Sequence, residues 1–175
     1  MSDFLEVMNA YFRGERMLAW AMLGLGLGML AFAFFVYRTQ TGGFMWGLVA
    51  PLAIVGIMAS TVGPFFAFHN ARIAEEIAGR YANDPAELAT TEGERMTRVN
   101  QNWPRLKMAW AVITIVALAL LLLVKQDWAN GLGLALMILV TVLFCIDVFG
   151  ERRALPYSDA LAALPAPAEA SPAEE

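Results

Sequence analysis

Hydrophobic residues gather in four long blocks along the chain, and polar segments separate the blocks. Each block has about the 17–25 residues that an α-helix needs to cross the hydrocarbon core of a bilayer. A helix is expected in each block, because backbone polar groups in lipid must be satisfied within the segment itself. The pattern therefore predicts an all-α integral membrane protein with four transmembrane helices. The expected spans cover approximately residues 17–37, 44–68, 108–124 and 128–149.

Short polar links join the first span to the second and the third span to the fourth. RTQTGG (38–43) and KQDWAN (125–130) are long enough only for tight turns. Spans joined in this way pack as antiparallel hairpins in helical bundles. The sequence therefore predicts one transmembrane domain, residues 17–150, built from two hairpins with the long connection 69–105 between them.

The long connection has the pattern of a cytoplasmic helical hairpin that continues beyond the membrane. Ile73, Ile77 and Tyr81 recur at four-residue spacing, which places them on one face of a helix. Asp84 followed by Pro85 is typical of a helix start, with the Asp84 carboxylate as N-cap. One interpretation is a self-packed spacer with a solvated charged face. The other is that the hairpin surface, marked by the isoleucine and tyrosine stripe, docks a partner or a second copy.

The two ends of the chain have different patterns. Residues 1–16 carry an apolar face, which favours an amphipathic helix lying on the membrane surface. This face consists of Phe4, Met8, Tyr11 and Phe12. The tail, residues 151–175, contains one short stretch that could form a helix, SDALAAL. The Pro/Ala/Glu-rich remainder has little to bury and is expected to be disordered.

A secretory signal peptide is the competing interpretation of the first block. Ala31-Phe32-Ala33 has the small-residue pattern of a cleavage site, and cleavage there would remove the first span. Acidic residues before the block and its apolar continuation through Val36 favour a retained span instead.

Composition and charge agree with a membrane protein and indicate its direction. Hydrophobic residues make up 59% of the chain, against about 45–50% in soluble domains. Of the 12 Lys and Arg residues, only Arg38 and Lys125 fall on the side of the short links. Because Lys and Arg favour the cytoplasmic side, both termini and the long connection are expected in the cytoplasm. The Ala-rich, short-looped style is typical of a bacterial inner (plasma) membrane protein.

Small residues and prolines predict how the first two spans pack. A GxxxG pair lets helix backbones approach closely. The predicted contact residues are Gly24 and Gly28 in the first span, and Gly56, Ser60 and Gly63 in the second, and these faces pack either within one chain or between chains. Proline removes a backbone hydrogen bond and kinks a helix, so Pro51 and Pro64 are expected to bend the second span.

One acid, Asp147, lies within the fourth span, where an ionisable residue is a candidate for function. It is about four residues, or roughly 6 Å, inside the expected exit from the membrane. His69 directly follows the second span and Lys107 directly precedes the third, so both are expected at a level similar to that of Asp147. The sequence therefore predicts an intramembrane polar clasp of Asp147, Lys107 and His69. The alternative is an ion or proton site, but no continuous polar path crosses the spans.

The remaining residues give no support to an enzyme or to a nucleic-acid-binding protein. No catalytic, metal-binding or cofactor motif is visible, and the basic residues form no stripe suited to nucleic acid. The expected role is that of a non-enzymatic scaffold, assembly or regulatory subunit, acting through the hairpin and the small-residue faces. Its partners would be the lipid bilayer, a second copy or a membrane complex. The alternative is a small oligomeric channel or transporter that uses Asp147 and the kinked second span.

Overall fold

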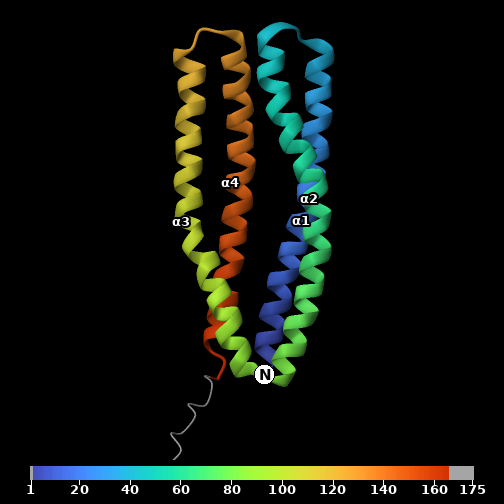
Figure 1. Cartoon of the computed structure of the whole chain (residues 1–175), viewed down its shortest axis with the longest axis vertical. Coiled ribbons are helices and arrows are strands. Elements are labelled where there is room, and N and C mark those ends of the chain that lie inside the picture. Colours follow the sequence, from blue (N-terminus) through green and yellow to red (C-terminus); the bar gives the residue numbers. More distant parts are fainter. Residues whose placement is uncertain (1, 166–175) are drawn as a thin grey trace, which may run out of the picture.

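The computed structural model describes residues 2–165 of the chain. Within these residues four α-helices follow one another: α1 (Ser2–Thr39), α2 (Gly42–Asn83), α3 (Pro85–Leu123) and α4 (Asp127–Ala162). Consecutive helices run in opposite directions along one long axis (Figure 1). Each helix contains a stretch that is long and apolar enough to cross a membrane. The predicted all-helical fold with four apolar helices is confirmed.

The helices divide at a common level into an apolar half and a polar half. The apolar half comprises residues 17–68 and 108–149, and the polar half comprises residues 2–16, 69–107 and 150–165. All four helices are continuous through this level. The boundary is therefore a change of composition within continuous helices.

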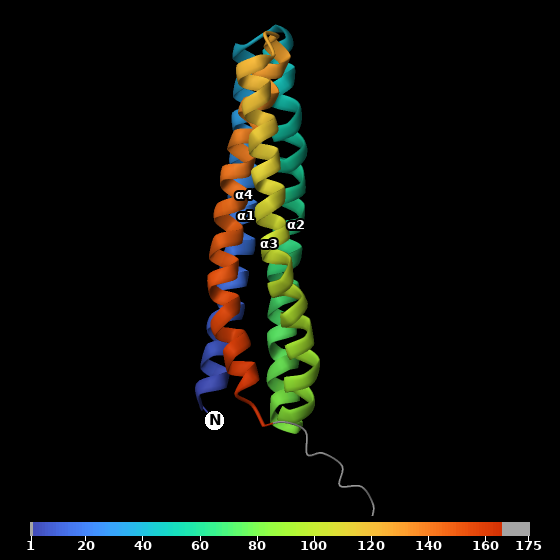
Figure 2. The same cartoon turned by 90° about the vertical axis from the view of Figure 1, so that its left-hand side faces the viewer.

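The apolar half is a row of helices one helix thick. From one end to the other, the row contains α3, α4, α2 and α1 side by side (Figure 1). Turned by 90°, the same helices overlap in a narrow column (Figure 2). A row has no axis that all four helices surround, so the apolar half is open to its surroundings on both broad faces.

Small residues bring neighbouring helices of the row together. A Cβ added at Gly26 of α1 would lie 2.7 Å from the Gly56 carbonyl oxygen of α2. Gly131 of α4 meets the α2 backbone, and Gly133 of the same helix meets Ala117 of α3. Backbones that approach this closely leave no room for a larger side chain, which is the usual packing mode of helices in lipid.

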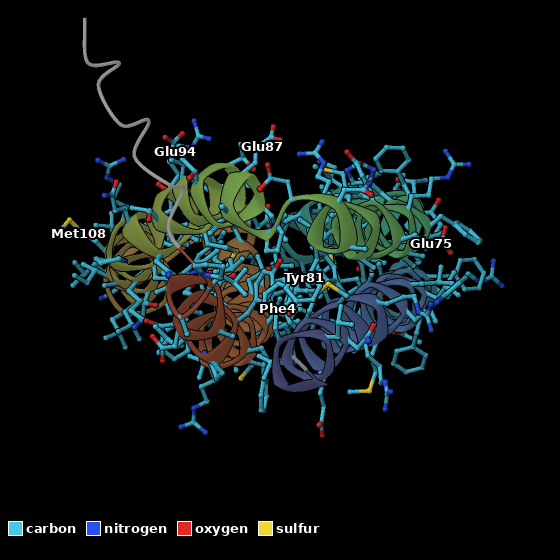
Figure 3. All side chains as sticks on the ribbon, turned by 90° about the horizontal axis from the view of Figure 1, so that it is seen from below. Phe4, Glu75, Tyr81, Glu87, Glu94 and Met108 are labelled. Carbon is cyan, nitrogen blue, oxygen red and sulfur yellow. The ribbon has the colours of Figure 1, made fainter. Side chains whose placement is uncertain are left out.

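The polar half is a closed four-helix bundle. Between the halves α1 and α2 cross (Figure 1). Below the crossing the helices separate into two layers, α1 with α4 and α2 with α3 (Figure 2). Viewed along the axis, Phe4 and Tyr81 point into the middle of the four helices (Figure 3). All four helices contribute to this core, whose buried residues are Phe4, Met8, Tyr11, Phe12, Ile77, Leu88, Met96, Ala154, Tyr157 and Leu161.

The turn between α2 and α3 forms as the sequence predicts. Asp84 Oδ1 accepts hydrogen bonds from the backbone N–H groups of Ala86, at 3.0 Å, and Glu87, at 2.9 Å. Pro85 follows as the first residue of α3. The predicted helical connection and its N-cap are confirmed.

Both chain ends depart from their predictions. The apolar face of residues 1–16 does not form a separate surface helix, because α1 is continuous and this face lies inside the bundle. Likewise α4 continues to Ala162 and buries Tyr157 and Leu161. The apolar residues of both chain ends pack against apolar faces of α2 and α3 in the polar half. The disorder expected for residues 166–175 lies outside the described residues.

Candidate functional site

The core of the polar half holds the one charged side chain that is buried among the described residues, Glu92 of α3, which is 7% exposed. Arg95, one turn further along α3, donates to it through Nε at 2.8 Å and Nη2 at 2.6 Å. Tyr157 of α4 donates its hydroxyl to Glu92 Oε1 at 3.1 Å. A buried carboxylate needs such partners, since an unpaired one costs several kcal/mol, on the order of the stability of a small domain.

Two tyrosines complete this cluster, which we call the Glu92 cluster (Tyr11, Glu92, Arg95 and Tyr157). Tyr11 of α1 stacks on Tyr157, with ring centroids 4.6 Å apart and planes 10° apart. Burial raises the pKa of Tyr157, and the negative charge of Glu92 raises it further. Burial also raises the pKa of Tyr11, with Glu15 adding to the effect. The hydrogen bond to Glu92 raises the pKa of Arg95, so the arginine stays charged and both phenols stay neutral around neutral pH.

The Glu92 cluster is suited to fixing the helices rather than to chemistry. Both carboxylate oxygens of Glu92 are already occupied by hydrogen-bond donors. A general base or nucleophile needs an oxygen within reach of a substrate, and this carboxylate is buried and bonded to Arg95 and Tyr157. The cluster ties α1, α3 and α4 to one relative register.

Polar contacts between α3 and α4 lead from the Glu92 cluster toward the apolar half. Asn100 Nδ2 donates to Ser158 Oγ at 2.9 Å. Lys107 Nζ lies 2.8 Å from Glu151. Both contacts belong to one register of the antiparallel helices. A step of seven residues along α3, from Asn100 to Lys107, matches a step of seven residues back along α4, from Ser158 to Glu151.

The predicted clasp of Asp147, Lys107 and His69 is not brought together. Asp147 Oδ2 accepts a hydrogen bond from the Trp110 indole N–H at 2.6 Å. In the register of α3 against α4, Lys107 lies about one turn closer to the polar end than Asp147 and therefore pairs with Glu151. His69 lies on the exposed side of α2, with its ring stacked against Phe65. Asp147 does fix α4 against a neighbouring helix, but through an indole rather than a cation.

Within the chain, the predicted helix-packing residues of α2 lie against α1, whereas those of α1 face away from α2. Gly56 and Gly63 lie against the α1 backbone, and Ser60 lies against Gly26. Gly24 and Gly28, by contrast, have no atom of a neighbouring helix within 4 Å of an added Cβ.

The face of α1 that contacts α2 carries a seven-residue repeat of small residues, and the GxxxG pair is not part of this repeat. Ala19, Gly26 and Ala33 are all buried and stand seven residues apart. A helix seam repeats every 3.5 residues, so Gly24 and Gly28 fall on another face. The repeat was visible in the sequence and identifies the contact better than the nearest glycine pair does.

The two prolines of the second span, Pro51 and Pro64, lie inside α2, which continues through both of them. The kinks predicted at these positions stay a prediction.

The predicted hairpin stripe faces inward. Ile77 is buried in the polar-half core, and Ile73 and Tyr81 pack against it. The Tyr81 and Phe4 ring centroids are 4.7 Å apart. These three residues are therefore core residues, which an apolar stripe at helical spacing usually is, and the exposed hairpin surface is the opposite, charged face.

Comparison with known proteins adds no functional assignment: the chain matches no family model, no curated protein and no solved structure. Across residues 2–165, no group of three or more His, Cys, Asp and Glu side chains is arranged to hold a metal ion. The geometry of the two halves is therefore the basis for a functional proposal.

Proposed function

We propose that the protein is a multi-pass inner-membrane protein that acts as a non-enzymatic scaffold, assembly or regulatory subunit. The apolar half would cross the bilayer four times, and the polar half would stand in the cytoplasm. The Lys and Arg distribution supports this direction, since Arg38 and Lys125 are the only two of 12 such residues at the far end of the row.

The continuity of all four helices from the row into the bundle is the observation that carries the proposal. The bundle has its own core, so its outer faces keep a fixed orientation relative to the row. Figure 3 shows Glu75, Glu87 and Glu94 on the outside of α2 and α3. The exposed charged residues of this α2–α3 face are Arg72, Glu75, Glu76, Arg80, Glu87, Glu94 and Arg98. A rigid surface of mixed charge favours a specific protein partner over general attraction to anionic lipid.

The alternative role, a channel or transporter, has less support from the geometry. Asp147 is half-buried and engaged with Trp110. A row of helices surrounds no conduit, so a pore would need several copies around a shared axis. Reconstituted protein that conducts protons or small ions, with flux lost in a folded Asp147→Asn variant, would favour this alternative.

Charge reversal on the α2–α3 face tests the proposed contact surface. A photo-crosslinking residue at position 91, which lies between Glu87 and Glu94, should capture one defined product in membranes. Glu87→Lys with Glu94→Lys should remove that product and leave the melting temperature within about 2 °C, because exposed substitutions cost little. Glu6→Lys with Asp159→Lys is the matched control, since both acids are exposed on α1 and α4. Equal loss from both pairs would rule out a specific α2–α3 surface.

Accessibility labelling tests the proposed direction. In a chain with Cys145 replaced by Ala, single cysteines at positions 41 and 130 should react with an impermeant reagent from outside intact cells. A cysteine at position 83 should react only after the cells are opened. External labelling at 83 would contradict the proposed direction.

A further inference from the structure

A groove of about 390 Å³ lies between α1 and α2 where the polar half meets the apolar half. Its polar lining comes from Asn9, Arg13 and Arg16 of α1 and from Asn70 and Glu75 of α2. The rest of the lining is Phe12 and three alanines of α2. Alanines on one wall keep the groove open, because they fill little of the space between the helices.

The groove gathers two cations that have no partner of opposite charge. Arg13 and Arg16 stand one helical turn apart and are both exposed. Neither forms a salt bridge with any side chain that the structure describes, whereas Arg80, Arg95 and Arg153 each pair with a glutamate. The one acid in the groove is Glu75, which lies five residues beyond Asn70 and pairs with neither arginine.

The level of the groove matches the headgroup region of a bilayer. Arg16 directly precedes the apolar half, and Asn70 lies two residues beyond Phe68. One turn inside the apolar half, Trp20 meets Phe68 edge-on at 5.9 Å. Exposed tryptophans favour the membrane interface. A ligand in the groove would therefore have its polar group beside the arginines and its apolar part along Trp20 and Phe68.

We propose that this groove binds the headgroup of an anionic phospholipid. Arg13 and Arg16 contact the phosphate oxygens, because guanidinium groups donate paired hydrogen bonds to phosphate. The Asn70 amide donates at the base of the groove. Acyl chains lie on the exposed apolar surface of α1 and α2 beside Trp20 and Phe68. The assignment rests on the proposed membrane placement of the apolar half.

Native mass spectrometry of the purified full chain tests the site, with phosphatidylglycerol as probe and phosphatidylcholine as reference. One basic residue near an anionic headgroup contributes about a fivefold factor in affinity. Arg13→Gln with Arg16→Gln should therefore weaken phosphatidylglycerol binding about 25-fold and leave phosphatidylcholine binding unchanged. Arg105→Gln with Arg152→Gln is the matched control, because both arginines are exposed near the same level but outside the groove. The control should change binding less than twofold.

Three outcomes would overturn the lipid site. The first is equal loss in both double variants, which would indicate attraction to surface charge in general. The second is unchanged binding in Arg13→Gln with Arg16→Gln. The third is glycerol 3-phosphate binding as tightly as the lipid with the same arginine dependence, which would identify a soluble phosphoester as ligand. Alkaline carbonate extraction of membranes separates this test from the placement: protein released by carbonate contradicts both proposals, whereas protein retained without arginine-dependent binding contradicts only the site.

Discussion

The helices of the two halves pack in different ways, although the same four helices build both halves. In the apolar half glycine and alanine make the closest contacts between helix backbones, beside a core that includes Leu48 and Leu52, and large residues such as Phe34 and Leu122 point outward. In the polar half the largest buried side chain is Tyr157, fully enclosed, and most charged side chains other than Glu92 lie toward the outside. The two halves therefore differ in the residues that make the closest contacts between helices: aromatic rings in the polar half, glycine and alanine in the apolar half.

This difference in packing follows from the surroundings proposed for each half. In water, burial of an aromatic ring is favourable because apolar surface leaves the solvent. In lipid there is no such gain, so helices associate through close backbone approach and small residues. This difference predicts that removal of a buried aromatic ring harms the polar half, whereas enlargement of a glycine at a helix contact harms the apolar half.

The largest expected effect is the removal of the Tyr157 ring. Tyr157→Ala should cost about 3–5 kcal/mol, as for other large buried rings replaced by alanine, and it leaves Glu92 with one donor fewer. Hydrogen exchange should accelerate across residues 69–107, while the apolar half stays inserted. Phe34→Ala is the control in the apolar half, since its ring is 66% exposed. Equal acceleration in both variants would contradict separate modes of packing.

The Tyr157 hydroxyl should contribute a smaller part, and its contribution should depend on pH. Tyr157→Phe removes the hydrogen bond to Glu92, and bonds to charged groups are worth about 1.5–3 kcal/mol. Because folding raises the pKa of Tyr157 above the ordinary value near 10, the folded state holds the phenolic proton more tightly than the unfolded chain. The resulting stability is complete below about pH 10 and is lost as the pH rises above it.

Denaturation curves of both proteins between pH 7 and pH 11 measure this dependence. Wild type should lose more stability than Tyr157→Phe at the alkaline end, and the variant should keep the smaller loss that comes from Tyr11. Parallel curves across the whole range would show that the hydroxyl is not linked to folding.

In the apolar half, enlargement at Gly26 should be harmful and enlargement at Gly28 should not. Gly26→Leu forces atoms into the α2 backbone, and overpacking costs about 1–3 kcal/mol. Gly28→Leu meets no neighbouring helix and gains helix propensity, worth up to about 1 kcal/mol. Melting temperatures in detergent distinguish the two substitutions. A greater loss at Gly28 would mean that the GxxxG face, rather than the Ala19, Gly26, Ala33 repeat, makes the contact.

The smallest expected effect concerns Asp147 at the boundary between the halves. Asp147→Ala and Trp110→Phe each remove the same hydrogen bond, so a double-mutant cycle should show coupling of about 0.6 kcal/mol, the average for membrane hydrogen bonds. Asp147→Ala and Lys107→Met should be additive, because these side chains have different partners. Coupling to Lys107 without coupling to Trp110 would restore the clasp expected from the sequence.

The sequence predicts what depends on local composition and misses what depends on helix register. The apolar stretches and the Asp84 cap are local properties, and both are found in the structure. The apolar face of residues 1–16 is equally suited to a membrane surface and to a protein core, so its partner could not be chosen from the pattern. The pairing of Glu92 with Tyr157 joins residues 65 apart, and no short motif marks it. Asp147 had several possible partners at its level, and only the α3–α4 register selects Trp110.

The unbroken helices at the boundary have a mechanical consequence. Residues 85–107 of α3 form a rod of about 35 Å, at 1.5 Å per residue. A tilt of about 10° at the base of such a rod displaces its tip by about 6 Å. Membrane helices adjust their tilt when the bilayer is thinner or thicker than their hydrophobic length. With the apolar half in a bilayer as proposed, a mismatch between bilayer thickness and hydrophobic length would tilt α3. The tilt would move the Asp84 turn, which lies at the end of the bundle far from the bilayer.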